Sequence, residues 1–199
     1  KRQILYGSST TVSAQDREPI SVGVLQFNAH GSLDENYRGF IEGLAELGYV
    51  EGENLTVNYV NAAAEISQLP SLASSIEAES DYLFAIATPS AQALANTTQD
   101  KVILFSSVAD PIGAGVVNSL EEPGRNLTGT TNIGPIEQQI NQILLPLVPE
   151  AEKIGLIYNS SEINAQYQVD IAVPILEEQG IKPVIKTISS TNDISQAMN

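Results

Sequence analysis

The stretch that decides the fold is Ile20-Ser-Val-Gly-Val-Leu-Gln-Phe-Asn-Ala-His-Gly31. It begins with an apolar run, which is typical of a buried strand, and ends in a polar loop. In the segment that follows, apolar residues recur at the spacing of one helical face: Leu33, Tyr37, Phe40, Ile41, Leu44 and Leu47. Ser32 followed by Glu35 predicts a capping box at the start of this helix, and Gly48 predicts its end. The stretch therefore predicts a strand, a loop and a helix, in that order.

The same alternation continues along the chain. Further strands are predicted at residues 55–60, 82–87, 102–105, 127–131, 153–158 and 183–188, and further helices at residues 65–78, 89–96, 110–118, 135–145 and 162–179. Asn192 and Asp193 predict the start of one more helix. Strands that alternate with helices are the signature of the α/β class, in which helices flank parallel sheets.

The chain is expected to divide after the fifth strand. Residues 121–134 are rich in glycine and predict a crossover between two sheets, with only two strands after it. We therefore expect a polar leader or tether at residues 1–19, a complete lobe at residues 20–130 and the first part of a second lobe at residues 131–199. Because two strands rarely close a core of their own, we expect the second lobe to be incomplete in this chain.

Composition excludes several classes of function. The chain has 199 residues, 24 of them acidic and 9 basic, and a net charge of −15. It therefore lacks the clustered lysine and arginine with which proteins bind nucleic acid or an anionic membrane surface. It contains no cysteine and one histidine, His30, which removes thiolate chemistry and most zinc sites. We therefore expect no cofactor and no metal, and most hydrolase chemistry is disfavoured; an enzyme that uses Asp110, Glu162 or His30 as acid or base is the alternative.

In open parallel α/β sheets, ligands bind beyond the carboxyl ends of the strands. The loops expected there are rich in hydroxyl and amide side chains and contain neither lysine nor arginine: Gln26–Asp34, Thr88–Gln92, Ser106–Pro111, Thr130–Asn132 and Asn159–Glu162.

The loop at Thr88 predicts an anion site. Thr88 suits a helix N-cap and Pro89 the first helical position, which would leave the backbone N–H groups of Ser90, Ala91 and Gln92 without partners. Such a helix N-terminus can hold a carboxylate or a phosphate, with the Ser90 hydroxyl as a further donor. An ordinary capped helix is the alternative.

Asp110 offers two interpretations. It precedes Pro111 and could cap its own helix, or it could turn toward the cleft and meet a ligand ammonium near the anion held at Ser90, with Ser107 between them. An anion site beside an acid suits a zwitterion. His30 could likewise cap a helix or stack on a ligand, and Glu162 could simply favour a helix N-terminus.

Five ordered blocks carry a family resemblance. They are His30-Gly-Ser-Leu-Asp34 with Gly39-Phe40, Ala85-Ile-Ala-Thr-Pro-Ser-Ala-Gln92, Val108-Ala-Asp-Pro-Ile-Gly-Ala-Gly115, Pro123-Gly-Arg-Asn-Leu-Thr-Gly129 and Ile154-Gly-Leu-Ile-Tyr-Asn-Ser-Ser-Glu162. From about residue 20 onward, the sequence resembles the bacterial ABC-transporter substrate-binding proteins associated with tryptophan and other aromatic amino acids.

The resemblance implies a two-lobed fold of the type I periplasmic-binding-protein kind, which closes at a hinge on a small ligand and delivers it to a membrane permease. It implies a monomer outside the cytoplasm, at the cell surface or in the periplasm, anchored through a segment outside these residues. A ligand-sensing module of the same fold, coupled to a signalling partner, is the alternative. The resemblance implies seven cleft residues: Thr88, Ser90, Ser107, Asp110, Asn132, Asn159 and Glu162. Ala91 and His30, from the loops that follow the strands, complete the candidate site.

Overall fold

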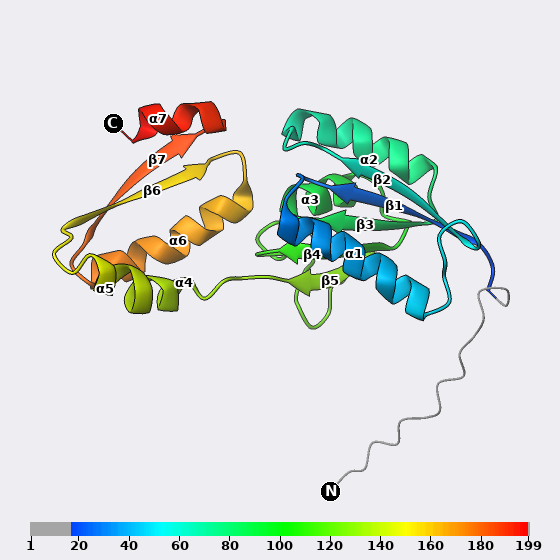
Figure 1. Ribbon diagram of the computed structural model, residues 1–199, viewed down its shortest axis with the longest axis horizontal. Helices are drawn as coiled ribbons and strands as arrows, with labels where there is room; N and C mark the ends of the chain where they lie inside the picture. Colours follow the sequence, from blue (N-terminus) through cyan, green and yellow to red (C-terminus); the bar gives the residue numbers. More distant parts are fainter. Residues whose placement is uncertain (1–16, 199) are drawn as a thin grey trace, which may run out of the picture.

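The computed structural model describes residues 17–198, so the predicted leader or tether lies almost wholly outside the described residues (Figure 1). Five parallel strands form the larger sheet, in the order β2-β1-β3-β4-β5. The strands are β1 (Ile20–Gln26), β2 (Leu55–Asn61), β3 (Tyr82–Ile86), β4 (Ile103–Val108) and β5 (Leu127–Thr131). Their apolar runs fit this position, because a parallel sheet is normally covered on both faces.

Helices cover both faces of this sheet. Helix α1 (Gly31–Glu46) lies on one face, where Phe40 stacks on Phe84 with the ring centroids 4.1 Å apart. Helices α2 (Leu69–Ala78) and α3 (Thr88–Thr97) lie on the other face, and a single 3-10 turn, η2 (Ile66–Gln68), leads into α2. We call residues 20–131 the five-stranded unit.

The rest of the chain forms a smaller unit. Its two parallel strands are β6 (Lys153–Asn159) and β7 (Lys182–Ile188), and α6 (Ile163–Glu178) connects them. A helical segment precedes β6 and consists of α4 (Ile136–Gln138), a π-helix η3 (Gln139–Leu144) and α5 (Leu145–Leu147). A 3-10 turn, η4 (Thr191–Asp193), and α7 (Ile194–Ala197) follow β7. We call residues 136–198 the two-stranded unit.

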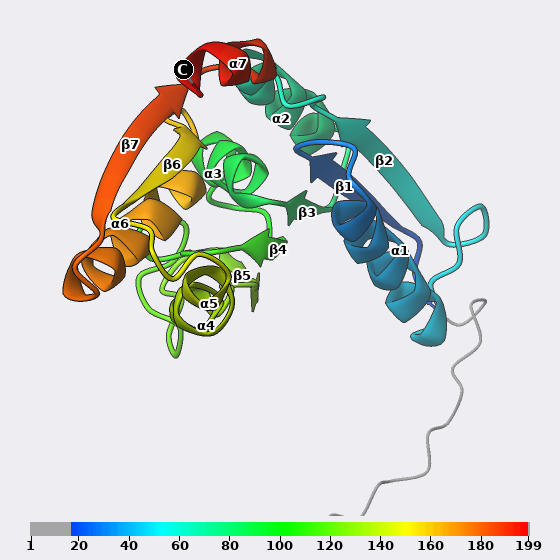
Figure 2. The same cartoon turned by 60° about the vertical axis from the view of Figure 1, so that its left-hand side comes forward.

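The carboxyl ends of the two sheets point toward each other. In Figure 1 the arrowheads of β1, β3 and β4 point toward the two-stranded unit, and those of β6 and β7 point toward the five-stranded unit. An extended segment, residues 132–135, joins the units (Figure 1), and Figure 2 shows the two units after a turn of 60° about the vertical axis. The predicted α/β class with flanked parallel sheets is confirmed, while the division at residues 130 and 131 stays a prediction.

Two local predictions are wrong. The capping box is absent because α1 begins earlier than expected: His30 is the N-cap, Ser32 lies inside the helix, and Glu35 forms an ion pair with Arg38. The helix expected at residues 110–118 is a series of turns, in which Gly115 has a φ of 71°, a left-handed conformation that interrupts an α-helix.

A third prediction is partly wrong. The helix expected at residues 135–145 extends to Leu147 and is a π-helix over residues 139–144. Pro146 follows that stretch and has no N–H with which to make the usual helical hydrogen bond, which is a common cause of such irregularity.

Candidate ligand-binding site

Helix α3 begins directly at the carboxyl edge of the larger sheet. A single residue, Ala87, separates it from β3, and the backbone of Ala87 has a φ of 80° and a ψ of 157°, a region in which residues other than glycine are rare. The N–H of Ala87 donates to the carbonyl of Ser106 on β4 (3.0 Å), and its carbonyl accepts from the N–H of Ala91 (3.1 Å). These two bonds hold the first turn of α3 against the sheet.

The start of α3 differs from the prediction by one residue. Ala87, not Thr88, is the N-cap, so Thr88 and Pro89 occupy the first two helical positions. Because the N–H of Ala91 is bonded within the helix and proline has no N–H, the groups of this turn that lack an acceptor in the described part of the chain are the N–H groups of Thr88 and Ser90.

Two buried hydroxyl groups lie on the same turn. The side chains of Thr88 and Ser90 are 2% and 0% exposed, and neither hydroxyl has a hydrogen-bond partner among residues 17–198. Buried polar groups normally have partners, since a missing bond costs about 1–3 kcal/mol. Two N–H groups and two hydroxyl groups at a helix N-terminus form a set of donors suited to an anion.

Ser106 and Ser107 of β4 add polar groups at the carboxyl edge of the larger sheet. We call this edge, together with the start of α3, the polar edge. Ser106 is the Cα partner of Ile86, the last residue of β3, and its buried hydroxyl also lacks a partner among the described residues. Ser107 has a φ of 57°, and its hydroxyl accepts a hydrogen bond from Asn36 of α1 (3.0 Å). Asn36 thus connects α1 with the end of β4.

Three of the other predicted residues have local roles. Oδ1 of Asp110 accepts from the N–H of Gly113 (2.9 Å), a bond within the turns that replace the expected helix. His30 is exposed and caps α1, where its Nδ1 accepts from the N–H of Ser32 (3.3 Å). The N–H of Asn132 donates to the carbonyl of Val108 at the end of β4 (3.4 Å).

The two-stranded unit contributes a second polar edge. Asn159 ends β6 and donates from Nδ2 to Oε1 of Glu162, the N-cap residue of α6 (3.0 Å). Its Oδ1 accepts from the N–H of Ser161 (3.0 Å). Asn164, in the first turn of α6, has a buried Oδ1 without a partner in the described chain.

The sequence analysis named Gln26 and Ser106 only as the first residues of two polar loops, and it named neither Asn36 nor Asn164. One signal could have found Gln26: side chains alternate between the faces of a strand, so Gln26 falls on the same face as Val22 and Val24, which are buried. A polar residue at a core position of a strand end deserves attention as a binding residue. The role of Asn164 depends on packing within the two-stranded unit and leaves no comparable signal.

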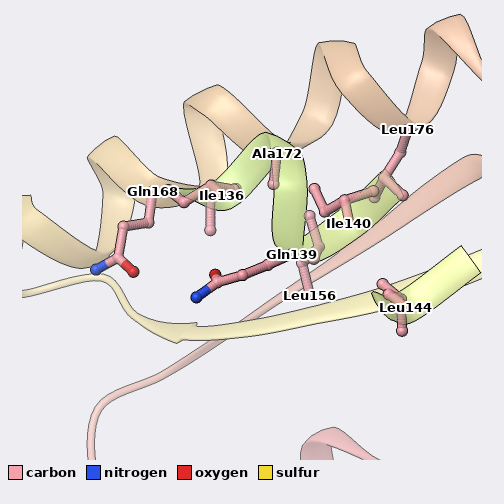
Figure 3. A pocket seen from close by; sticks show the side chains of 9 residues that line it. Ile136, Gln139, Ile140, Leu144, Leu156, Gln168, Ala172 and Leu176 are labelled. Atoms are coloured by element: carbon pink, nitrogen blue, oxygen red, sulfur yellow. The ribbon is translucent and has the colours of Figure 1, made fainter. Parts of the chain in front are cut away.

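An apolar pocket of about 300 Å³ lies elsewhere (Figure 3). It lies within the two-stranded unit, between the helical segment at residues 136–147 and α6, with Leu156 of β6 at its base. Ile140, Ala172 and Leu176 line it and also form the core of this unit. The pocket is therefore a gap in the packing of one unit, distinct from the polar edges.

Residues 17–198 contain neither a cluster suited to a metal ion nor a helix suited to a membrane span. No group of three or more histidine, cysteine, aspartate and glutamate side chains among them is arranged to hold a metal ion. None of their helices combines the length and the apolar character needed to cross a membrane.

Known proteins resemble most of this chain. The sequence model described as ABC transporter substrate binding protein matches residues 21–199. A tyrosine-binding protein of Clostridioides difficile is 36% identical over 193 residues. A solved structure of an ABC domain from Streptococcus pneumoniae in complex with L-Trp is 35% identical with a TM-score of 0.84. The ligand-free, open structure of a substrate-binding protein with adhesive properties from Clostridium difficile is 36% identical with a TM-score of 0.63.

These matches cover most of this chain and part of each relative. The alignment with the tyrosine-binding protein covers 96% of this chain and 56% of that protein, and each structural match covers 90% of this chain and 61% of the other. The chain thus spans little more than half the length of these relatives. The family match extends over nearly all of the described residues, which confirms the resemblance: the chain belongs to the family of ABC transporter substrate-binding proteins.

Proposed function

We propose that the chain is the ligand-binding part of an extracytoplasmic substrate-binding protein of an ABC importer, and that its ligand is an aromatic amino acid. The observation that carries the proposal is the turn at Thr88 and Ser90, where two N–H groups and two buried hydroxyl groups remain as donors. A ligand carboxylate bound there needs no basic side chain. The relatives' ligands, tyrosine and L-Trp, agree with this choice of ligand class.

The remaining predicted cleft residues belong to the same proposal. Ser107, Asp110 and Asn132 would border the ligand on the five-stranded unit, and Asn159 and Glu162 would close over it from the two-stranded unit. The facing carboxyl ends of the sheets support this arrangement. Ala91, predicted as a further backbone donor, offers no open N–H, because that group is bonded to the carbonyl of Ala87.

Hinge closure on the ligand is the proposed mechanism. The TM-score is higher with the L-Trp complex (0.84) than with the ligand-free, open structure (0.63), at nearly equal identity and equal coverage. The match is thus closer to a ligand-bound arrangement than to an open one. In the proposed cycle, the ligand binds the open form through α3 and shifts the population toward the closed form.

We propose binding without chemical turnover. The single histidine, His30, supports this proposal, because it is exposed and caps α1. The groups left open at the candidate site are neutral hydroxyl, amide and backbone groups, which bind a ligand without activating it.

Isothermal titration of the full-length protein against the common amino acids tests the proposal. We expect binding of at least one aromatic amino acid, and a loss of about tenfold to hundredfold in its affinity in Ser90→Ala, because a hydrogen bond to a charged group is removed.

Ser74→Ala is the matched control. Ser74 lies on the exposed surface of α2, and its hydroxyl donates to the carbonyl of Pro70, so its removal leaves the affinity unchanged. The proposal fails if the protein binds none of the amino acids, or if Ser90→Ala binds as tightly as the unmodified protein.

A further inference from the structure

Gln26 is a fully buried amide at the carboxyl end of β1, with 0% of its surface exposed. Its Nε2 donates to the carbonyl of Asn28 (2.8 Å) and to Oδ1 of Asp34 in the first turn of α1 (2.7 Å). Both partners are acceptors only, so the amide nitrogen must face them. The orientation of the amide is thereby determined, and Oε1 points away from these two partners.

Oε1 of Gln26 is a buried acceptor that no residue in the described chain supplies with a donor. A buried carbonyl oxygen of this kind normally accepts at least one hydrogen bond. The unpartnered atom of Gln26 therefore calls for an N–H or O–H group from outside the described residues.

The position of Gln26 connects it with the anion site. Gln26 is the Cα partner of Ile86 on the neighbouring strand β3. Ile86 is followed by Ala87 and then by Thr88, the first residue of α3. The acceptor on β1 and the open donors at the start of α3 thus lie at the same carboxyl edge of the sheet, with the Gln26 side chain on the face that α1 covers and α3 on the other face.

We propose that Oε1 of Gln26 accepts a hydrogen bond from the α-ammonium group of the ligand. This inference rests on the proposed function, in which the ligand carboxylate lies at Thr88 and Ser90. An α-amino acid carries its ammonium and carboxylate groups on one carbon atom, so an acceptor beside the carboxylate site meets the ammonium group before any side-chain group.

Asp34 strengthens this assignment as a positioning residue. Its carboxylate accepts from Nε2 on the opposite end of the same amide, which polarises the amide and makes Oε1 a better acceptor. A negative charge one hydrogen bond away also favours a cationic donor over a neutral hydroxyl. Oδ1 of Asp110, the ammonium partner considered from the sequence, instead accepts from the N–H of Gly113.

The test compares ligands that differ only in the ammonium group. The first pair is L-tryptophan and 3-(indol-3-yl)propanoate, and the second is L-tyrosine and 3-(4-hydroxyphenyl)propanoate. The quantity measured is the ratio of the two dissociation constants in the full-length protein. In Gln26→Met, which keeps the length of the side chain, the preference for the amino acid should fall by about tenfold to hundredfold. The affinity for the propanoate should stay nearly constant.

Two further variants complete the experiment. Asp34 lies on an exposed turn, and Asp34→Asn keeps an acceptor for Nε2 of Gln26. We therefore expect this variant to fold and to lower the preference for the amino acid by a smaller factor. Gln179→Met is the matched control, because Gln179 is the exposed C-cap residue of α6, at the opposite end of that helix from Glu162, and the exchange should leave the preference unchanged.

The outcomes separate the two proposals. Equal losses for both ligands in Gln26→Met would show that Gln26 only supports the fold, and an unchanged preference in Asp34→Asn would likewise overturn the inference. If the unmodified protein binds none of the four compounds, the proposed function fails together with this inference.

Discussion

The two units contain similar apolar strands but bury them to different degrees. In the five-stranded unit the last five residues of β1 and the last four of β3 are buried. In the two-stranded unit none of the residues of β6 and β7 is buried, and Ile157 and Ile185 are 39% and 48% exposed. A parallel strand is thus buried by its neighbours rather than by its own composition. Among the described residues, the buried polar atoms without a partner at Gln26, Thr88, Ser90 and Ser106 lie in the five-stranded unit, and the one at Asn164 lies in the two-stranded unit.

The largest difference between the units should appear in core substitutions. Leu25→Ala removes a fully buried side chain of the five-stranded unit, and we expect it to lower the free energy of unfolding by about 3 kcal/mol. Leu156→Ala removes a half-buried side chain of β6 and should cost about 1 kcal/mol. Urea unfolding followed by circular dichroism measures both, and equal losses would show that the two cores are packed equally well.

A smaller effect is expected from the same exchange at two alanines. Ala87→Gly removes the strain of a left-handed backbone at the sheet edge, and we expect it to raise the free energy of unfolding by about 1 kcal/mol. Ala165→Gly in α6 replaces a good helix former and should lower it by about 0.5–1 kcal/mol. Thermal unfolding gives both signs; a destabilised Ala87→Gly variant would mean that this backbone conformation is not strained.

The smallest effect concerns two aspartates, one in each unit. Hydroxyl and backbone hydrogen bonds from Ser21 lower the pKa of Asp81, and backbone and hydroxyl hydrogen bonds from Ser189, with a further N–H from Ser190, lower the pKa of Asp193. A lowered pKa in the folded state stabilises the protein above the ordinary value of 3.8 and ceases to do so as the pH falls through the folded value.

Substitution to asparagine measures these contributions. Asp81→Asn should be the more costly at pH 7, because Asp81 ties together two strands 60 residues apart, whereas Asp193 bonds only to residues three and four positions away. Each difference from the unmodified protein should shrink below pH 4 in stability curves recorded against pH. Differences that persist in acid would exclude the carboxylate charge as their cause.

The alternation of apolar and amphipathic stretches predicted the class of fold because burial in a layered α/β protein follows that alternation directly. The details that failed depend on single backbone angles. Ala87 takes the N-cap position from Thr88 because its N–H bonds to Ser106, a contact between two strands that local sequence does not reveal. Gly115, with its left-handed backbone, replaces an expected helix by turns.

The same distinction applies to the candidate site. Ser90 was predicted from the pattern of a proline next to a capping residue, and the structure leaves its hydroxyl open. Gln26 was overlooked because its importance comes from Asp34 and Asn28, which fix the direction of its amide. Residue types next to a strand can be read from sequence, whereas the direction in which an amide points depends on its neighbours in space.

The polar edge of the five-stranded sheet offers hydroxyl, amide and backbone groups, and the loops that form it contain neither lysine nor arginine. Such dipoles act at contact distance, whereas the attraction of a full charge extends outward and is screened by dissolved salt. The affinity of a site built this way would change little between dilute and saline surroundings. In the proposed function, this property would keep ligand capture constant as the surrounding ionic strength rises and falls.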